Sequence, residues 1–432
     1  MGEIMKVKKT AGLVGTVHIP GDKSISHRSI MLGGLADTPI TITNFLHAAD
    51  CWSTIGCMRA LGVSVEQDDK GVLTVKGNGL YGLREPQDVL DAGNSGTTLR
   101  LLTGLLGVQP FFSVMTGDAS LRKRPMGRVV TPLAKMGVRI LGREQSRYAP
   151  LAINAAEQIQ GIEYAMPVAS AQVKSAILLA ALFAKTATEI TEPVPSRDHT
   201  ERMFETFGIP VQRAGSAIRL EPVKRLAAPE QINVPGDISS AAFWLVAASI
   251  VPNSRLVLVN VGINPTRTGI LDILIQMGAD ITVTNERWSG QEPVADIVVR
   301  SASLRGVTIE VEMIPRLIDE IPVLAVAALF AEGQTVVKGA EELRVKETDR
   351  LKAIALELGK MGANITETAD GLSILGPQKL NHAACYSHHD HRMAMAVAVA
   401  GIAAQGVEIQ ESDCVKISYP DFFNVLAGLR QD

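Results

Sequence analysis

The sequence contains few aromatic residues and few cysteines. Its 432 residues include ten Phe, five Tyr and three Trp, too few to suggest the aromatic platforms on which nucleic-acid bases stack. Four cysteines (Cys51, Cys57, Cys385 and Cys414) in a chain of this length do not make a disulfide framework, so a reducing cytoplasm is predicted. None has a clear activating neighbour in the sequence, and thiol catalysis is therefore not indicated.

Long apolar runs and an excess of charge are also missing. The longest apolar run, near 241–252, is far shorter than the ~20 residues that a membrane span needs. The first ten residues, MGEIMKVKKT, lack the apolar core of a signal peptide. Lys and Arg number 42 against 45 Asp and Glu, a net charge of −3, which gives no bulk attraction to nucleic acid. We therefore expect a cytoplasmic globular protein, with no nucleic-acid or membrane partner.

Two standard catalytic signatures are absent. A P-loop needs Gly-x4-Gly-Lys-Ser/Thr, and here Asp22 stands between Gly21 and Lys23. No Gly-x-Ser-x-Gly nucleophile elbow occurs. The missing nucleotide loop argues against a kinase.

The sequence does contain a half-chain repeat. The segment 19–22 (Ile-Pro-Gly-Asp) recurs at 234–237 (Val-Pro-Gly-Asp), a shift of 215 positions. Each copy is followed by a Ser-containing turn, an apolar helix-like stretch and a β-branched run. A duplication of this size predicts two similar lobes, and pockets form preferentially at domain interfaces, so a ligand site between the lobes is expected.

A shorter period divides each half. A large apolar residue, Gly and a small apolar residue recur five times, with the glycines at 62, 137, 208, 278 and 362, where a helix C-terminus is expected before a strand. A sixth, degenerate unit would begin at about Ser387. The pattern predicts six α/β units of roughly 70 residues, three in each half, each alternating short strands with two amphipathic helices.

The duplication also shows which residues the scaffold does not need. Lys23 of the first copy becomes Ile238 in the second, and Arg28 becomes Phe243. Both cations follow a turn that opens a helix, where exposed N–H groups already attract anions. They are candidates for anion binding, with a solvated Lys and a surface Arg as the alternative.

Other helix starts also carry candidate groups. Gly96 would let a ligand approach the backbone closely, although a capping role explains its Ser/Thr-rich turn equally well. Ser170 and Gln172 are polar hydrogen-bonding residues at the start of the next unit's helix. Asp319 lies between apolar residues, as a carboxylate whose pKa burial would raise or as an N-cap.

The last two units contain clusters of charge. Lys346 and Arg350 are expected on one helix face at i,i+4, where two like charges are unfavourable unless an anion lies between them. The segment 388–392 (His-His-Asp-His-Arg) is suggestive of a metal site, but no second Cys or His cluster accompanies it, and no metal is predicted. Cations and helix starts in both halves predict small, multiply anionic substrates.

Six motifs in order resemble the 3-phosphoshikimate 1-carboxyvinyltransferase (EPSP synthase) family over essentially the full chain. They are Gly-Asp-Lys-Ser-x-Ser-His-Arg (21–28), Gly-Asn-Ser-Gly-Thr-Thr-x-Arg (93–100), Arg-Pro-Met (124–126), Ser-Ala-Gln-x-Lys (170–174), Arg-Val-Lys-Glu-Thr-Asp-Arg (344–350) and Asp-His-Arg-Met-Ala (390–394). Segments 170–174, 197–201 and 264–267 look like the class II subgroup, which is often tolerant of glyphosate.

The resemblance implies a fold of two pseudo-symmetric lobes, each an inside-out α/β barrel of three βαβαββ repeats. The N-terminal lobe would span 19–235, and the C-terminal lobe would span 1–18 plus 236–432. It also implies the activity: transfer of the enolpyruvyl group of phosphoenolpyruvate to the 5-hydroxyl of shikimate 3-phosphate, with release of phosphate, on the shikimate pathway to chorismate and aromatic amino acids. No metal, cofactor or covalent enzyme intermediate is implied, and a monomer is expected.

The resemblance further assigns site residues. Shikimate 3-phosphate would be bound by Lys23, Ser24, Arg28, Ser170, Gln172, Asp319 and Lys346. Phosphoenolpyruvate would be bound by Lys23, Gly96, Arg124, Gln172, Arg350 and Arg392. Asp319 would accept the hydroxyl proton, Glu347 would exchange a proton with the methylene carbon, and Lys23 would lie where both substrates meet.

Some positions depart from the family pattern. Glu342 stands where many members have Asn, Ala171 replaces a second Ser, and Lys416 is displaced by one position, so these three are left out of the predicted site. Because Gly96 is retained, inhibitor tolerance cannot be predicted from that position.

Two alternatives remain open. The enolpyruvyltransferase that acts on UDP-N-acetylglucosamine shares the fold, but it has a reactive Cys in a mid-lobe loop, and this chain has none between Cys57 and Cys385. A non-catalytic binding protein for phosphorylated metabolites is disfavoured because anion binding gains nothing from the carboxylates of Asp319 and Glu347.

Overall fold

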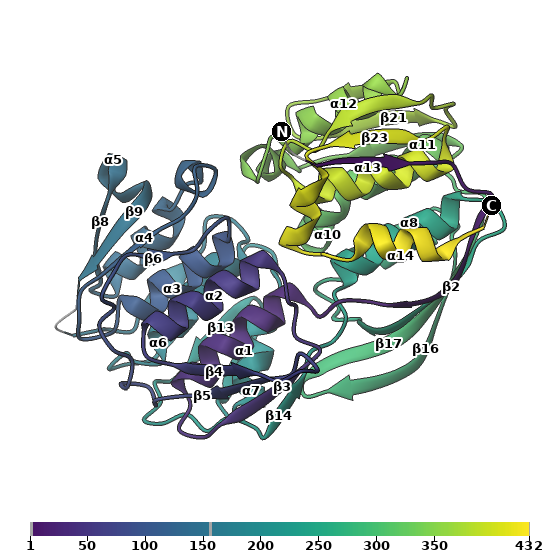
Figure 1. The fold of residues 1–432 in the computed structure, drawn as a ribbon. Coiled ribbons are helices and arrows are strands. Elements are labelled where there is room, and N and C mark those ends of the chain that lie inside the picture. Colours follow the sequence, from purple (N-terminus) through teal and green to yellow (C-terminus); the bar gives the residue numbers. More distant parts are fainter. Residues whose placement is uncertain (1–2, 155–157, 432) are drawn as a thin grey trace. The chain divides into compact units, whose positions relative to one another are not determined.

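The computed structural model describes residues 3–154 and 158–431, which form two compact units (Figure 1). The N-terminal unit comprises 21–234 and 289–292, and the C-terminal unit comprises 3–20, 235–288 and 293–431. Segment 289–292, the tip of the hairpin between 280–289 and 292–300, belongs with the N-terminal unit. In the chain that the structure describes, no helix is long and apolar enough to cross a membrane.

The first three repeats follow the expected order of strand, helix, strand, helix and two strands. Repeat one is β2 (Gly12–His18), α1 (Lys23–Leu35), β3 (Ile40–Thr43), α2 (Ala49–Ala60), β4 (Ser64–Gln67) and β5 (Leu73–Lys76). Repeat two is β6 (Leu90–Asp91), α3 (Gly96–Leu106), β7 (Ser113–Thr116), η1 (Leu121–Lys123), α4 (Gly127–Lys135), β8 (Arg139–Gly142), α5 (Arg143–Ser146) and β9 (Tyr148–Asn154). Repeat three is β10 (Glu163–Ala165), α6 (Ala171–Ala181), β11 (Thr188–Thr191), α7 (His199–Thr206), β12 (Val211–Ala214) and β13 (Ala217–Leu220).

Repeats four and five have the same order, with short helices added in repeat five, and repeat six follows it as far as its second long helix. Repeat four is β14 (Gln231–Asn233), α8 (Ile238–Ile250), β15 (Arg255–Gly262), α9 (Gly269–Gln276), β16 (Asp280–Ser289) and β17 (Glu292–Arg300). Repeat five is β18 (Thr308–Ile309), η2 (Val311–Met313), α10 (Ile314–Leu317), η3 (Ile318–Glu320), α11 (Ile321–Phe330), β19 (Gly333–Val337), η4 (Glu341–Val345), α12 (Arg350–Lys360), β20 (Ile365–Glu367) and β21 (Leu372–Gly376). Repeat six is β22 (Ala383–Tyr386), α13 (His391–Ala403), β23 (Val407–Gln410), η5 (Ser412–Ile417), α14 (Phe422–Leu429) and β24 (Arg430–Gln431).

Each sheet joins a parallel pair of strands to antiparallel neighbours. Repeats two, three and five each form one sheet in the order first, second, last, third, such as β6-β7-β9-β8. Repeats one and four exchange their first strands: β14 pairs in parallel with β3, and β2 with β15. The exchange explains why the chain passes twice between the units near 20 and 235.

Repeat six has no final hairpin of its own. β1 (Ile4–Val7) pairs antiparallel with β23 and completes that sheet, and β24 pairs antiparallel with β2. The N-terminal strand therefore belongs to the C-terminal unit, and the sheets stay separate rather than closing into one barrel.

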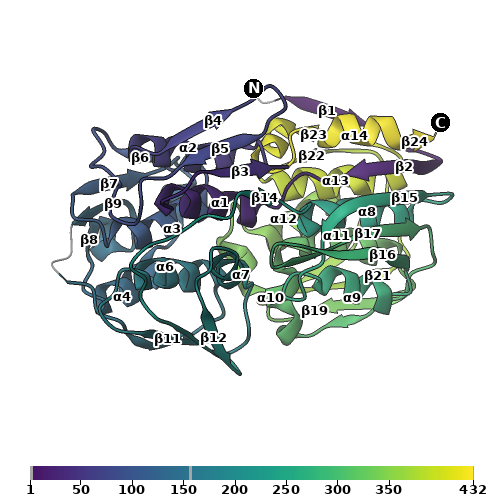
Figure 2. The same cartoon turned by 90° about the horizontal axis from the view of Figure 1, so that it is seen from below.

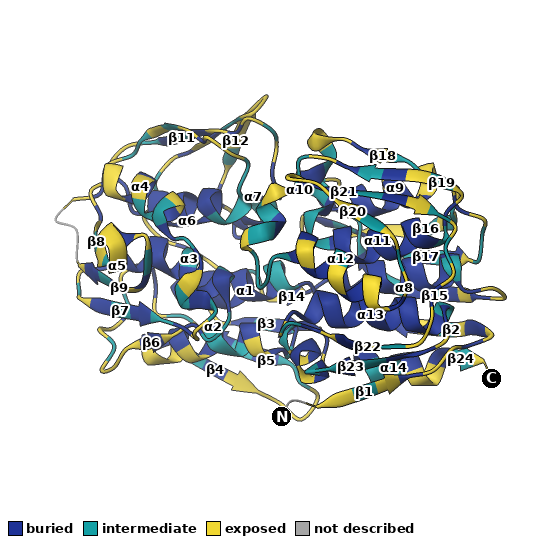
Figure 3. Ribbon diagram, turned by 90° about the horizontal axis from the view of Figure 1, so that it is seen from above, coloured by how far each residue is buried: buried dark blue, intermediate teal, exposed yellow. Residues whose placement is uncertain are grey.

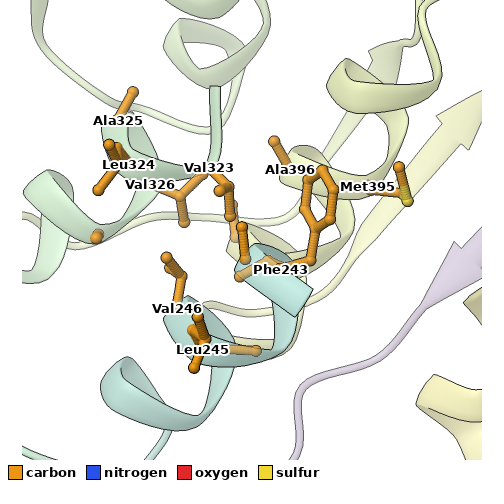
Figure 4. Packing of buried hydrophobic residues seen from close by; sticks show 14 of the residues in the cluster. Phe243, Leu245, Val246, Val323, Leu324, Ala325, Val326, Met395 and Ala396 are labelled. Carbon is orange, nitrogen blue, oxygen red and sulfur yellow. The ribbon is translucent and has the colours of Figure 1, made fainter. Parts of the chain in front are cut away.

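One helix of each repeat lies in the interior of its unit. In the C-terminal unit these inner helices are α8, α11 and α13, which contact one another. Figure 4 shows side chains from all three meeting, Phe243 and Val246 from α8, Val323 from α11 and Ala396 from α13 among them. In Figure 3 the same helices are coloured as buried along almost their whole length. The expectation of two amphipathic helices per repeat is therefore wrong for the inner helix, which buries all its faces.

The inner helices of the N-terminal unit are α1, α3 and α6 (Figure 2). They too are buried, except for residues near their N-termini: Lys23 and Ser24 in α1, Thr97 and Arg100 in α3, and Ala171 and Gln172 in α6. The parts of these helices open to solvent or a ligand are thus the first turns, where backbone N–H groups have no intrahelical acceptor.

The five periodic glycines follow the C-caps of the outer helices α2, α4, α7, α9 and α12. All five have positive φ, from +75° at Gly208 to +103° at Gly137. The expected helix ends are confirmed, because this left-handed backbone is costly for any residue with a Cβ atom.

A matched pair of alanine substitutions tests this account. Neither Gly208 nor Gly56, which lies inside α2 of the same unit, has an atom within 4 Å of the position a Cβ would take. Gly208→Ala should destabilise the protein by about 1–2 kcal/mol, because its φ is +75°. Gly56→Ala should stabilise it by about 0.5–1 kcal/mol, because alanine loses less backbone entropy in a helix. Urea denaturation measures both, and shifts of the same sign would contradict the assignment.

Candidate functional site

In the N-terminal unit, the predicted residues gather at the first turns of the inner helices. Each turn is capped by a side-chain oxygen: Asp22 accepts from the backbone N–H of Ile25 (2.9 Å), Ser95 from that of Thr98 (3.1 Å), and Ser170 accepts at 3.5 Å. The caps fix the turns and leave other N–H groups and the positive end of each helix dipole available to an anion.

Side chains join these turns to one another. Lys23 donates to Asp50 of α2 (3.1 Å). Arg100 of α3 donates to the Gln172 oxygen (2.5 Å), and the Gln172 amide donates to Thr97 (3.1 Å). Gln172 is thus held in one orientation by both of its polar atoms.

A buried polar line also runs from α1 through α2 to α3. His27 Nδ1 lies 2.7 Å from the Thr54 hydroxyl, Thr54 lies 2.6 Å from Thr98, and Thr98 lies 2.7 Å from Ser95. Burial, reinforced by the charges of Lys23 and Arg28, lowers the pKa of His27. His27 is therefore neutral near pH 7 and fixes the helices without adding charge.

Arg28 is a buried cation with neutral partners. It donates to the Thr200 hydroxyl (2.7 Å), the Ser175 hydroxyl (2.6 Å) and the backbone oxygen of Ser24 (2.9 Å). Its exposed fraction is 5%, and among the residues described no carboxylate lies within ion-pair distance of it. Burial lowers the pKa of Arg28 to about 10, which still leaves a positive charge at neutral pH. A buried cation oriented by hydroxyls is suited to a ligand anion.

Gly96 leaves room in front of two guanidinium groups. A Cβ at this position would lie 3.1 Å from Arg100 Nη1 and 3.4 Å from Arg124 Nη1. Arg124 is 7% exposed and donates to the Asn94 side chain (2.8 Å). The predicted close approach at Gly96 thus faces fixed cations.

In the C-terminal unit, the predicted residues gather around Arg350. This side chain is 1% exposed and donates to Asp390 (2.7 Å), Asp319 (3.1 Å) and Glu347 (2.6 Å). Burial alone would lower the pKa of Arg350, but the attraction of Asp390, Glu347 and Asp319 raises it above its usual value. Arg350 therefore fixes the two predicted catalytic carboxylates in place.

Asp319 lies in η3, between three cations. Besides Arg350, Lys346 Nζ and Arg392 Nη2 each lie 3.8 Å from its carboxylate, and Arg392 also donates to its backbone oxygen (3.2 Å). Asp319 is not the N-cap of α11, a position that Glu320 occupies without a capping bond. Of the two sequence-based alternatives, the N-cap is wrong.

The prediction of Lys346 and Arg350 on one helix face is also wrong. Lys346 precedes α12, whose N-cap is Asp349 and whose first residue is Arg350. The anion between the two cations is a carboxylate of the protein itself, that of Asp319.

The histidine-rich segment 388–392 does not form a metal cluster in the part of the chain that the structure describes. His388 pairs with Glu357 (2.7 Å), and Asp390 caps α13, beside its bond to Arg350. The cysteines are buried, and burial raises the pKa of Cys57 and Cys385 to about 12, which disfavours a reactive thiolate.

One glycine pattern resembles a dinucleotide-binding fingerprint. Segment 77–82 (Gly-Asn-Gly-Leu-Tyr-Gly) matches Gly-x-Gly-x-x-Gly. It follows the antiparallel strand β5 and leads to β6 without an intervening helix. In this described segment there is therefore no helix N-terminus that could bind a pyrophosphate.

Sequence reasoning missed several residues that hold the predicted ones in place. These are Asp50, Arg100, Thr200 and Asp390. Arg100 and Asp390 both lie inside motifs given above. Arg100 is four residues after Gly96 on the same helix, and Asp390 is a helix N-cap, so their positions in the sequence could have indicated a role in the site. Asp50, and Thr200 inside the segment 197–201, contact residues 27 and 172 positions away, so these pairings become visible only in the fold.

Comparison with known proteins gives a match along the whole chain. The model of the family described as EPSP synthase (3-phosphoshikimate 1-carboxyvinyltransferase) matches residues 7–426. A 3-phosphoshikimate 1-carboxyvinyltransferase of Desulforudis audaxviator is 57% identical over 427 residues, 99% of each chain. One of Gloeobacter violaceus is 54% identical over 433 residues, the full length of both.

Solved structures agree. An EPSP synthase of Acinetobacter baumannii superposes with a TM-score of 0.87 at 45% identity, covering 99% of this chain and 98% of that one. The enolpyruvyl transferase NikO of Streptomyces tendae has a TM-score of 0.79 with the same coverage, and at 17% identity it is evidence of a shared fold alone.

The charge cluster predicts unequal effects for two cations that flank Asp319. Arg350→Met leaves the fully buried Asp390 carboxylate without its partner and should cost about 3–5 kcal/mol of unfolding free energy. Lys346→Met removes a cation that is 28% exposed and 3.8 Å away, and should cost less than about 1 kcal/mol. Urea unfolding followed by the fluorescence of the buried Trp244 in the same unit measures both. Equal losses would contradict the central place of Arg350.

Proposed function

Because the chain belongs to the EPSP synthase (3-phosphoshikimate 1-carboxyvinyltransferase) family, we propose that it transfers the enolpyruvyl group of phosphoenolpyruvate to the 5-hydroxyl of shikimate 3-phosphate. The observation that carries the proposal is 57% identity to a protein of that name along 99% of both chains. The clusters at the helix starts supply the kinds of groups the reaction needs.

The reaction makes three physical demands. The methylene carbon of phosphoenolpyruvate must gain a proton, so that C2 becomes electrophilic and the sugar hydroxyl adds to it. The hydroxyl must lose its proton. The tetrahedral intermediate must then lose a proton from the methyl group and expel phosphate. Each step requires positioned charge and proton transfer, and we propose that no metal or cofactor takes part.

The N-terminal unit supplies groups for shikimate 3-phosphate. Arg28 offers a buried cation, and Gln172 is fixed by Arg100 and Thr97. Ser24 lies in the first turn of α1, and Ser170 is the N-cap of α6. We propose that these side chains and Lys23 bind the anionic sugar, with N–H groups of the helix starts adding to the attraction.

The C-terminal unit supplies the carboxylates. Three cations compensate the charge of Asp319, which we propose accepts the hydroxyl proton. Glu347, held by Arg350 at 2.6 Å, is proposed to exchange the proton at the methylene carbon. Lys346, next in sequence, would contact shikimate 3-phosphate. The proposed ligands thus include residues of both units.

Phosphoenolpyruvate carries a phosphate and a carboxylate, so it needs several cations. We propose that Arg124, Arg392 and Lys23 bind it, with Gly96 allowing close approach and Gln172 donating a hydrogen bond. Arg350 is also proposed as a ligand. Its three carboxylate partners imply that much of its effect comes from holding Asp319 and Glu347 in position.

The test of the proposed function is phosphate release from phosphoenolpyruvate. Release is expected with shikimate 3-phosphate and not with UDP-N-acetylglucosamine, the acceptor of a related transferase. Release only with the sugar nucleotide would overturn the substrate assignment and keep the reaction type. No release with either acceptor, from folded protein, would favour a binding protein without catalytic activity.

Two isosteric variants test the proton-transfer roles. Asp319→Asn and Glu347→Gln keep the volume of each side chain and remove its basicity, so each should lower kcat by about 10²–10⁴-fold, the usual contribution of a general acid or base. Single-turnover measurements with both substrates saturating separate this loss from weaker binding. Turnover near that of the wild type in either variant would remove that residue from the mechanism.

A further inference from the structure

A buried cluster of charge lies next to the proposed sugar-phosphate site. Lys174 of α6 donates to Glu192 (2.8 Å) and Glu201 (2.7 Å), and these three side chains are 1%, 3% and 1% exposed. The ammonium also donates to the backbone oxygen of Ser196 (3.3 Å), whose own N–H donates to Glu192 (3.3 Å). Lys174 thus joins α6 to both ends of the segment 192–201, which leads into α7.

Lys174 and its neighbour Ser175 form two adjacent links to α7. The first link is the ion pair of Lys174 with Glu201. The second is the hydrogen bond between Ser175 and Thr200, whose hydroxyl oxygens lie 2.6 Å apart. Consecutive residues on one helix therefore contact consecutive residues on the other, which fixes both the separation and the rotation of the two helix starts.

Arg28 of α1 donates hydrogen bonds to both residues of the second link. Its Nε donates to Thr200 (2.7 Å) and one terminal nitrogen donates to Ser175 (2.6 Å). The direction of the guanidinium is therefore set by two hydroxyls, one on each of the two helices that the first link joins. The Ser175 hydroxyl also donates to the backbone oxygen of Ala171 in its own helix (2.6 Å). Figure 2 shows α1, α6 and α7 in the same unit.

The cluster is a costly way to stabilise a fold. Burial alone would lower the pKa of Lys174, but the attraction of Glu201 and Glu192 raises it, so the side chain is charged at neutral pH. One cation faces two carboxylates, and one oxygen of Glu201 has no hydrogen-bond partner. Apolar residues of similar volume often stabilise a core as well or better. What the ion pair adds is a defined geometry between α6 and α7.

We propose that Lys174 is a positioning residue for shikimate 3-phosphate: by tying Glu192 and Glu201 to α6, it holds Thr200 and Ser175 where they aim Arg28 at the substrate anion. This inference rests on the proposed function. In this account four residues affect substrate recognition only through Arg28 and do not touch the reacting atoms. They are Lys174, Glu192, Glu201 and Thr200.

The test is a charge-balanced double variant, Lys174→Met with Glu201→Gln. It removes one positive and one negative charge and leaves Glu192 bonded to Ser196. We expect KM for shikimate 3-phosphate, and its Kd by calorimetry, to rise about tenfold, the effect of misaligning a charged hydrogen bond. KM for phosphoenolpyruvate should stay within about twofold of the wild-type value, because in the described part of the chain none of the residues proposed to bind that substrate is bonded to the cluster.

Two companion variants separate positioning from stability. Ile177→Ala truncates a buried side chain of the same helix and should lower stability while leaving both KM values unchanged. Lys174→Arg keeps a cation between the two carboxylates and should restore KM for shikimate 3-phosphate to within about threefold of the wild-type value. If the double variant fails to fold, Thr200→Val removes the acceptor of Arg28 Nε and should raise the same KM about tenfold.

The outcomes separate this inference from the proposed function. A folded double variant whose KM for shikimate 3-phosphate stays within about twofold of the wild-type value would overturn the inference alone. The same conclusion would follow if both KM values rose together, or if Ile177→Ala or Lys174→Arg matched the double variant. Wild-type protein that neither bound nor turned over shikimate 3-phosphate would overturn the proposed function, and the positioning role with it.

Discussion

The complete burial of one helix in each repeat is the constraint on which the rest of the structure depends. α8, α11 and α13 pack against one another, and α1, α3 and α6 are buried beyond their first turns. A helix covered by apolar neighbours has few places for a charged group, and its first turn is one of them, because N–H groups there need partners from outside the helix. Burial therefore concentrates the polar residues of each unit at the helix starts, where anions are also attracted.

Arg28 of the N-terminal unit and Arg350 of the C-terminal unit are buried cations that are stabilised in opposite ways. Arg28 is surrounded by hydroxyls and a backbone oxygen, so its charge is left to a ligand. Arg350 is surrounded by three carboxylates, so its positive charge is balanced by groups of the protein itself. Asp319 and Glu347 are held in place as a result. The first arrangement suits recognition of an anionic substrate and the second suits proton transfer. In the second copy of the half-chain repeat, Ile238 and Phe243 stand where the first copy has Lys23 and Arg28.

The repeat architecture was predictable from sequence because its signals are local. Each of five outer helices is followed by a glycine with positive φ, one residue beyond the C-cap. The exchange of β2 and β14 between repeats was not predictable from residue patterns, because parallel pairing leaves no mark on either strand. The site followed the same rule. Its helix starts were predicted, whereas the contact of Asp319 with Lys346 and that of Arg28 with Thr200 join residues far apart in the chain.

Backbone hydrogen exchange with and without saturating shikimate 3-phosphate tests most directly whether the helix starts are the working part of the molecule. We expect protection to increase in peptides covering 22–28 and 170–175, the first turns of α1 and α6, while the outer strands β4, β8 and β12 exchange at unchanged rates. Protection that appeared in those outer strands, or none at the helix starts despite measured binding, would contradict the account.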